Sequence, residues 1–510
     1  MSKFTSKAKA FFGKESFSLG TLTAVVIAAV LAFNVIFYVL SLTLGLVIQP
    51  ATKDEFLLSG VTDEMFETAR AEKKKVKVSF CMTEEALRAH DVGSFVLRTA
   101  KEFEKRYPDL IELEYINVIS KKNSKGEYVP LSNYERDMLG NEQSIARGSV
   151  IFECGNSYKV VTDYYSSAGF ADFFTLDSSG NAIAYNGEEF FSAMVAWVLT
   201  DKHEKAYFTK GHSEQLDIAF HQLLTAAGYY VDTIDVSKVD EIPEDAGLVI
   251  ISNPRSDFER AAEGSKLYAE IDKLELYLER GGKLYVSLDP YVKKLYALEE
   301  LLSSCGISLS ATEIDGVERR DIIKDSANAL TNDGFTVVAE PSTDSELAAS
   351  IANKTSKYSD GGIVVREACA LNLSGSAKPL LVSSSSAVCE TAGVTTRRDG
   401  NFCIAAYSEL VYGEGSTPAG VFVVPSIYTT ISDALVTNGY VNKDFHYALF
   451  EELFGASQKM PYGCHSVLYN TQTLENLTVG AARAYTAAVI AVPALIALAG
   501  TVIIVKRKNR

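Results

Sequence analysis

The sequence predicts an α/β fold that lies between two apolar segments, one near each end of the chain. Between residues 205 and 310, short apolar runs alternate with segments of helical period, which indicates a parallel sheet with helices on both faces. Residues 76–204 follow the order strand, helix, strand, hairpin, helix. The mean hydropathy is slightly positive although the net charge is −16, so apolar residues are concentrated in part of the chain.

The composition excludes several classes of protein. A chain of 510 residues, 47% of them hydrophobic and 22% charged, has the length of about three folded domains. The acidic excess, 65 Asp and Glu against 49 Lys and Arg, argues against nucleic acid as a partner, because binding phosphates needs clustered basic side chains. The seven cysteines show no CxxC spacing, so neither a disulfide scaffold nor a zinc site is expected.

Residues 19–48 and 485–505 are expected to cross a membrane. Ser16–Thr52 contains no Asp, Glu, Lys or Arg, and it exceeds the about 20 helical residues that span a bilayer. A cleavable signal peptide would have a shorter apolar core and a small-residue cleavage site close behind it. The second segment is also uncharged and is followed by the basic tail Lys506–Arg510, which a helix in a soluble core would not explain.

Basic residues flank the two segments on their outer sides: Lys3, Lys7, Lys9 and Lys14 precede the first, and four more follow the second. Because basic residues stay on the cytoplasmic side, both termini are expected in the cytoplasm. Residues 49–484 are then extracytoplasmic, and the protein is a multi-pass protein of the cell membrane. The chain between the basic tips has 41 basic and 64 acidic residues, a net charge of −23.

Residues 76–204 are expected to form a thioredoxin-like unit. Alternation, apolar periodicity and a Gly-Asn-Ser turn predict its elements. In chain order these are the strand Val76–Met82, the helix Asp91–Tyr107, the strand Ile111–Ile119, the hairpin Ser149–Cys154 with Tyr158–Thr162, and the helix Glu188–Thr200. The redox motif CxxC is missing and Cys81 lies alone inside a strand, so redox catalysis is not expected.

Residues 205–475 are expected to form the second α/β domain. Its strands are predicted at Ala206–Thr209, Tyr230–Val236, Leu248–Ser252, Lys283–Leu288 and Gly420–Val424. Its helices are predicted from near Ser213 to Gly228, at Lys266–Arg280 and at Asp444–Phe454. Residues 311–420 are more loosely patterned, with short strands only. We expect this insertion either to extend the sheet or to form a small companion.

The candidate site lies where ligands bind in open α/β sheets, outside the carboxyl ends of the strands. Three loops, Lys210–Glu214, Asn253–Asp257 and Asp289–Tyr291, are expected there, and they could bring together His212, Glu214, Asn253 and Asp289. They could form a small polar binding site or an acid/base pair. Alternatively, the loop residues have structural roles: Ser213 caps the following helix, Glu214 complements its dipole, and Pro290 ends a strand.

Motifs for catalysis and cofactors are absent from the sequence. There is no GxxxxGK[ST], HExxH or GxSxG, so the chain itself is not expected to hydrolyse ATP. The turn after Lys283–Leu288 holds Asp289-Pro290 and offers no nucleophile, since Ser287 lies within the strand. No two histidines share ligand spacing on one element. We therefore expect no cofactor, no metal site and no enzymatic activity.

The layout resembles the Gldg family, auxiliary membrane subunits of ABC-type transport systems first associated with gliding motility. The resemblance rests on the two terminal apolar segments, on Lys210-Gly211-His212-Ser213-Glu214, similar to the family's G-H-x-E, and on Leu248–Pro254 and Gly281–Pro290. After the late strand the chain departs from the family, with Pro425-Ser426-Ile427. The resemblance covers essentially the whole chain. It implies a degenerate class I amidotransferase-like (flavodoxin-like) extracytoplasmic domain, a separate ATPase and a separate multispan permease.

Two functions remain open at this point. The first is a non-catalytic subunit of an ABC transporter complex that presents an acidic extracytoplasmic domain for binding or scaffolding. The second is a membrane-tethered enzyme that acts on carbohydrate or peptide through a crevice of His212, Glu214 and Asp289. The expected organisation is a cytoplasmic N-terminus 1–18, a span 19–48, a linker 49–75, the two units 76–204 and 205–475, a linker 476–484, a span 485–505 and a cytoplasmic tail 506–510.

Overall fold

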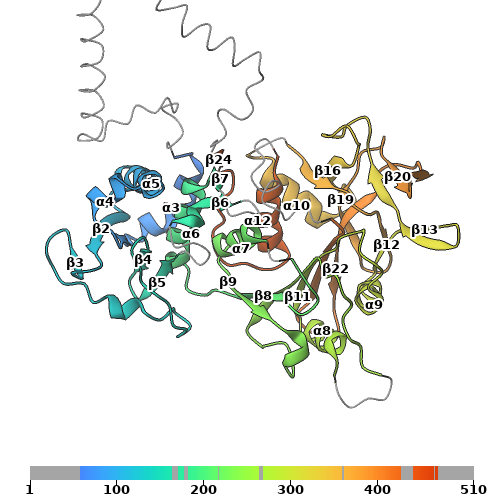
Figure 1. Ribbon diagram of the computed structural model, residues 1–510, viewed down its shortest axis with the longest axis horizontal. Helices are drawn as coiled ribbons and strands as arrows, with labels where there is room; N and C mark the ends of the chain where they lie inside the picture. The colour runs from blue at the N-terminus through green and yellow to red at the C-terminus, as the bar shows by residue number, and fades with distance from the viewer. Residues whose placement is uncertain are drawn as a thin grey trace, which may run out of the picture.

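The computed structural model of the chain describes residues 58–162, 170–176, 182–215, 217–262, 268–358, 361–426, 440–464 and 466–468. They form a mixed α/β structure that contains a parallel sheet (Figure 1). Within these ranges, no helix has both the length and the apolar composition needed to cross a bilayer. The predicted spans 19–48 and 485–505, the two tips and the linker 476–484 lie outside the described residues.

The first unit has a mixed sheet in the order β3-β2-β1-β4-β5. Strand β1 (Val76–Phe80) pairs in parallel with β2 (Ile111–Asn117), and helix α5 (Gly93–Arg106) connects them. Strand β4 (Val150–Cys154) runs antiparallel to β1 and forms a hairpin with β5 (Ser157–Val161). The short elements α4 (Glu84–Arg88) and β3 (Lys122–Asn123) complete this part of the chain. The strands β1, β2, β4 and β5 and the helix α5 follow the predicted order, whereas α4, β3 and the later strands β6 (Phe174–Leu176) and β7 (Ala182–Tyr185) were not predicted.

A helix lies within the segment 49–75, for which the sequence predicts a linker. Helix α3 spans Val61–Ala71 and buries Thr62, Met65, Phe66 and Ala69, which recur at the i, i+3, i+4, i+7 spacing of one helical face. The ring of Phe66 packs edge-on against that of Tyr107, with centroids 5.3 Å apart. Because charged residues surround this short apolar stripe, the sequence pattern did not predict the helix. The linker prediction is therefore wrong for residues 61–71.

Within the described ranges, the second sheet contains eleven strands. Its parallel part has the order β9-β8-β10-β11-β23, as the alternation of apolar runs with helices predicts. Its strands are β8 (Lys205–Thr209), β9 (Tyr230–Ile234), β10 (Ala246–Ser252), β11 (Lys283–Ser287) and β23 (Ala419–Val424). Gly228, at a φ of 94°, follows the end of α7 (Ile218–Ala226), in the left-handed conformation that a helix terminus of this type requires.

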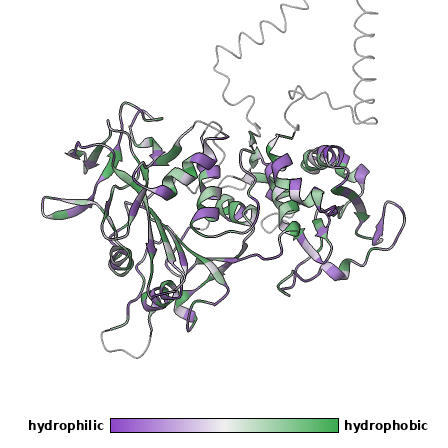
Figure 2. Ribbon diagram, turned by 180° about the vertical axis from the view of Figure 1, so that it is seen from behind, coloured by the Kyte–Doolittle hydropathy of each residue, from purple (hydrophilic) through white to green (hydrophobic). Residues whose placement is uncertain are grey.

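Successive residues of these strands face two separate apolar cores. Phe208, Ile250 and Tyr285 join one core with α7, α10 (Glu346–Thr355) and α12 (Asn442–Glu452). Their strand neighbours join a second core with α8 (Glu270–Glu279) and α9 (Tyr296–Ser304). Helices therefore cover both faces of the sheet (Figure 1), and the hydrophobic colour follows the central strands in Figure 2.

The insertion 311–420 both extends the sheet and forms small companions. Antiparallel strands continue the large sheet beyond β23 in the order β22-β19-β16-β17. The strands concerned are β16 (Thr336–Pro341), β17 (Ile363–Arg366), β19 (Lys378–Val382) and β22 (Cys403–Leu410), with β12 (Ile307–Leu309) and β18 (Leu371–Leu373) beside them. Separate small sheets are formed by β13 (Ala311–Ile314) with β14 (Val317–Arg320), and by β15 (Ile322–Lys324), β20 (Val388–Thr391) and β21 (Val394–Arg397).

The two units share one of the apolar cores, through helix α6 (Gly187–Leu199). The buried carboxylate of Glu189 accepts from Lys443 Nζ at 2.7 Å and from Tyr447 Oη at 2.5 Å. Strand β24 (Val467–Leu468) returns to the first unit and pairs with β7 (Ala182–Tyr185), which also pairs with β6 (Phe174–Leu176). A short strand from the end of the second predicted domain therefore lies in a sheet with residues of the first.

Candidate functional site

Three parallel strands deliver the candidate residues to one edge of the large sheet. In the register of these strands, Phe208 of β8 lies beside Ile250 of β10, and Ser252 lies beside Ser287 of β11. The loops that carry His212, Asn253 and Asp289 follow these strands directly, so they leave the sheet at the same edge. This position is the one at which open α/β sheets bind ligands.

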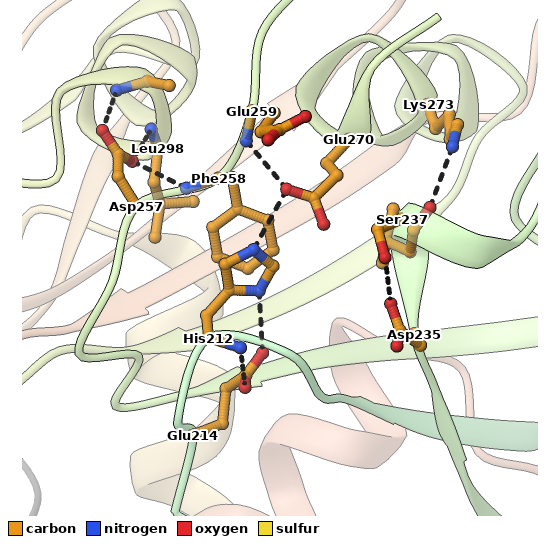
Figure 3. Close-up of polar contacts among 12 residues, drawn as sticks. His212, Glu214, Asp235, Ser237, Asp257, Phe258, Glu259, Glu270, Lys273 and Leu298 are labelled. Atoms are coloured by element: carbon orange, nitrogen blue, oxygen red, sulfur yellow. Dashed lines mark hydrogen bonds and ion pairs between the residues drawn. The ribbon is translucent and has the colours of Figure 1, made fainter.

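His212 lies in a buried cluster with two carboxylates. Its Nδ1 is 3.3 Å from Glu214 Oε1, and its Nε2 is 3.0 Å from Glu270 Oε2 (Figure 3). The second oxygen of Glu214 accepts from the His212 backbone N–H at 2.7 Å. All three side chains are at least nine-tenths buried. We call His212, Glu214 and Glu270 the histidine cluster.

The backbone and one aromatic ring fix the orientation of the imidazole. Gly211 and Ser213, on either side of His212, have φ angles of 126° and 59°, so the chain turns sharply there. The ring of Phe258 stacks on the imidazole with centroids 3.9 Å apart and an interplanar angle of 19° (Figure 3). The backbone carbonyl of His212 also accepts from the N–H of Arg255 at 2.8 Å. The loops after β8 and β10 therefore hold each other in place.

The electrostatics of the cluster favour a charged imidazole. Burial alone lowers the pKa of His212, but the hydrogen bond to Glu214 and the negative charges of Glu270 and Glu214 outweigh it and raise that pKa above its ordinary value. Burial raises the pKa of Glu214, and the bonds to His212 reverse this effect, so that this pKa is lowered. An imidazolium donates from both nitrogens, so one His212 can bind both carboxylates.

Glu270 is the member of the cluster that the sequence analysis missed. It is the first residue of α8, and its Oε2 also accepts from the backbone N–H of Glu259 at 2.8 Å. A carboxylate in the first turn of a predicted helix was a usable signal, but Glu270 lies 58 residues from His212. The sequence alone does not predict that Glu270, at the start of α8, contacts His212 in the loop after β8.

The structural roles expected for this loop differ in detail from the observed ones. Helix α7 begins at Ile218, and its N-cap is Asp217, whose Oδ1 accepts from Ala219 N–H at 2.9 Å. Ser213 therefore does not cap this helix, and Glu214 binds His212 at a distance from the helix start. The left-handed backbone at Ser213 separates the loop from the helical period that follows, which corrects the expected start near Ser213.

Asn253 and Asp289 reach the same edge, but the hydrogen bonds observed there do not join them to His212. Asp289 Oδ1 accepts from the backbone N–H of Tyr291 at 2.9 Å. Asn253 has a φ of 49° and donates its backbone N–H to the Ser287 carbonyl at 2.9 Å. Its buried Oδ1 has no hydrogen-bond partner among the described residues. The structure thus brings His212 and Glu214 together and leaves Asn253 and Asp289 with separate roles.

The seven cysteines form no disulfide and no metal-binding group in the part of the chain that the structure describes. There, no group of three or more His, Cys, Asp and Glu side chains is arranged to hold a metal ion. All seven cysteines are free. Burial raises the pKa of the Cys81 thiol to about 12, so at neutral pH this thiol is protonated and is a weak nucleophile.

Comparisons with known proteins give only distant similarities. No protein-family model and no curated protein matches the chain. Among solved structures, the mmIFT52 N-terminal domain is 16% identical with a TM-score of 0.36, covering 49% of this chain and 97% of its own. A putative ThuA-like protein from Bacteroides uniformis is 13% identical (TM-score 0.30, 51% and 94% covered), and a glutamine amidotransferase from Thermotoga maritima is 11% identical (TM-score 0.27, 50% and 99% covered). Similarities this low assign neither a family nor an activity to the chain.

Proposed function

We propose that the chain is a non-catalytic, membrane-tethered subunit of an ABC-type transport complex, as its resemblance to the Gldg family implies. In this proposal, residues 19–48 and 485–505 cross the cell membrane, both termini are cytoplasmic, and residues 49–484 form the extracytoplasmic part. A separate ATPase and a separate permease carry out transport. The two units are then a thioredoxin-like unit without CxxC and a degenerate amidotransferase-like domain.

The observation that carries the proposal is the meeting of the two ends of the described body. Ser59 donates from its backbone N–H and its hydroxyl to Glu188 Oε1, at 2.5 and 2.7 Å. At the other end, Leu468 of β24 pairs with Ala184 of β7. Ala184 and Glu188 are four residues apart, so both ends are attached to one short stretch of chain. Two spans that continue from these ends can enter the same membrane side by side.

The histidine cluster supports the non-catalytic part of the proposal. A general acid or base must reach the proton that it transfers. Both ring nitrogens of His212 are engaged by Glu214 and Glu270 inside the protein. Asp289, which the enzymatic hypothesis requires beside His212, accepts from Tyr291 instead. The cluster is suited to fixing the loop after β8 to the start of α8.

The proposal is tested by co-purification from the native host. The full-length chain with an affinity tag is extracted in a mild uncharged detergent, and its partners are identified by mass spectrometry. An unrelated two-span protein with the same tag is the control. We expect an ABC ATPase and a multispan permease in fixed ratio with the chain and absent from the control. Intact chain recovered without either of them would overturn the proposal.

A matched variant separates scaffolding from catalysis. His212→Gln removes the only titrating group at the centre of the histidine cluster that can act as an acid near neutral pH. If the chain acts by binding, the folded fraction of this variant recovers the ATPase and permease as the unchanged chain does, and transport in the host continues. A folded His212→Gln chain that assembles fully but abolishes transport would point to chemistry at His212 instead.

A further inference from the structure

A pocket lies beside the carboxyl end of β11. Its first lining residue, Pro290, directly follows Asp289 in the sequence. The pocket is bounded by the loop Pro290–Lys294 and by the hairpin of β13 and β14, and its volume is about 320 Å³. This volume lies in the range of about 300–1,000 Å³ typical of small-ligand sites. The hairpin projects from the body at one end of the molecule (Figure 1). We call this site the basic pocket.

The pocket concentrates positive charge on an acidic protein. Its charged lining residues are Lys293, Lys294, Arg319, Arg320 and Glu318. Lys294 pairs with Glu318 at 3.1 Å, and Arg320 pairs with Glu299. Lys293 and Arg319 are exposed, and no ion pair joins either of them to a carboxylate within the described ranges. Two of the four lining cations are thus not paired with a carboxylate, and they attract anions although the chain as a whole carries −16.

An exposed aromatic ring borders the same space. Tyr291 lines the pocket and is 63% exposed, whereas most large aromatic side chains of this body are buried. A tyrosine combines a flat apolar face with a polar hydroxyl, which matches the apolar face and the hydroxyl groups of a sugar ring. The pocket thus offers a charged sugar an exposed aromatic ring and two cations that are not paired with a carboxylate.

We propose that the basic pocket binds an anionic sugar, a saccharide that carries a carboxylate or a phosphate group. Arg319 and Lys293 bind the anionic group, since a guanidinium binds both carboxylate and phosphate through two parallel hydrogen bonds. Tyr291 packs against the sugar ring. This inference goes beyond the proposed transport function and holds whether or not the chain associates with a permease.

The test measures binding to the purified full-length chain in an uncharged detergent by isothermal titration calorimetry. The probes are glucuronate, glucose 1-phosphate, neutral glucose and inorganic phosphate. The variants are Lys293→Gln with Arg319→Gln, and Tyr291→Ala. The matched control is Lys121→Gln with Lys125→Gln, which removes the same charge from an exposed loop of the first unit. Thermal unfolding of each variant verifies that it is folded.

We expect at least one of the two charged sugars to bind more tightly than glucose, and its binding to weaken with added salt. The Lys293/Arg319 variant weakens that binding by roughly tenfold or more, because it removes both unpaired cations. Tyr291→Ala weakens the charged sugar and leaves inorganic phosphate unchanged. The Lys121/Lys125 control binds as the unchanged chain does.

Three results would each overturn the proposal: no binding of either charged sugar, binding of glucose as tight as theirs, or equal effects of the Lys293/Arg319 and Lys121/Lys125 variants. A Tyr291→Ala chain that binds the charged sugars normally would also overturn it, because the pocket would then bind only a bare anion. The titration uses the isolated chain, so its failure is distinguishable from a failure to recover the ATPase and permease.

Discussion

The histidine cluster and the basic pocket both lie near the carboxyl edge of the large sheet, and they treat charge in opposite ways. In the histidine cluster, one imidazole and two carboxylates are buried and bind each other. In the basic pocket, Lys293 and Arg319 are exposed, and no ion pair joins either of them to a carboxylate within the described ranges. The charges of the cluster bind each other and stabilise the fold, whereas two cations of the pocket are available to bind a ligand.

The position of a site at a strand end therefore does not by itself assign it a function. Both regions meet the topological rule for ligand sites in open α/β sheets. What separates them is solvent access and the pairing of their charged groups. Substitutions should therefore affect the stability of the protein in the first region and its binding in the second.

The largest effect is expected for His212→Leu. This change leaves the buried carboxylates of Glu214 and Glu270 facing each other without a cation, and breaking a buried ion pair costs about 3–5 kcal/mol. The free energy of unfolding of the full-length chain is measured in denaturant through the fluorescence of Trp197, the single, buried tryptophan. A loss below about 1 kcal/mol would contradict the assignment of a charged cluster.

A neutral triple variant provides the control for this prediction. With His212→Leu, Glu214→Gln and Glu270→Gln combined, the histidine cluster carries no charge, and the glutamines still accept from the backbone N–H groups of residues 212 and 259. We expect this variant to regain most of the lost stability. A triple variant as unstable as His212→Leu would mean that packing of the imidazole on Phe258 is the main contribution.

A smaller loss is expected for Glu189→Gln, at the contact between the two units. Lys443 loses its ion pair, while Tyr447 keeps an acceptor for its hydroxyl. Hydrogen bonds to charged groups contribute about 1.5–3 kcal/mol, and we expect a decrease of this size in the free energy of unfolding. The exposed Glu244→Gln is the matched control and should change it by no more than about 0.5 kcal/mol. Equal effects of the two substitutions would show that the buried pair does not stabilise the contact.

The stability from the histidine cluster should depend on pH. The pKa of His212 is raised above 6.5, so its contribution is complete below pH 6.5 and is lost as the pH rises through the folded-state pKa. The pKa of Glu214 is lowered below 4.5, so its contribution is present above pH 4.5 and is lost as the pH falls. The difference in unfolding free energy between the unchanged chain and the neutral triple variant should therefore peak between these values. A difference that keeps growing above pH 7 would contradict the assignment.

The smallest effect on stability is expected in the basic pocket. Lys293→Gln with Arg319→Gln removes exposed cations that pair with no carboxylate in the described part of the chain, so the free energy of unfolding should change by about 0.5 kcal/mol or less. The measurement is the same denaturant titration. A loss of several kcal/mol would mean that these side chains hold the hairpin in place, and the contrast with the histidine cluster would disappear.

The sequence predicts those elements of the fold whose apolar period is long or whose ends are marked by glycine. Strands β10 and β23 and the end of α7 at Gly228 are of this kind. Helix α3 was missed because its apolar stripe is short and lies among charged residues. The start of α7 was placed too early, because a left-handed residue such as Ser213 leaves no mark in the hydrophobic pattern.

The candidate site was predictable only where it is local in sequence. His212 and Glu214 are two residues apart, and the turn between them brings them together. Glu270 and Phe258 reach the imidazole through the packing of α8 and its preceding loop, and no spacing in the sequence encodes that packing. Asn253 and Asp289 were placed at the correct edge by topology, but their hydrogen bonds depend on loop geometry.

The attachment of the two ends has a mechanical consequence. The N-terminal side is anchored by a helix with four buried residues, whereas the C-terminal side is anchored by the two-residue strand Val467–Leu468. Tension along the chain therefore meets unequal resistance, and it peels the short strand from Ala184 and Tyr185 before it dislodges Phe66. A pulling force on the two ends of the described body would therefore release Val467–Leu468 first and leave the core around Phe66 folded.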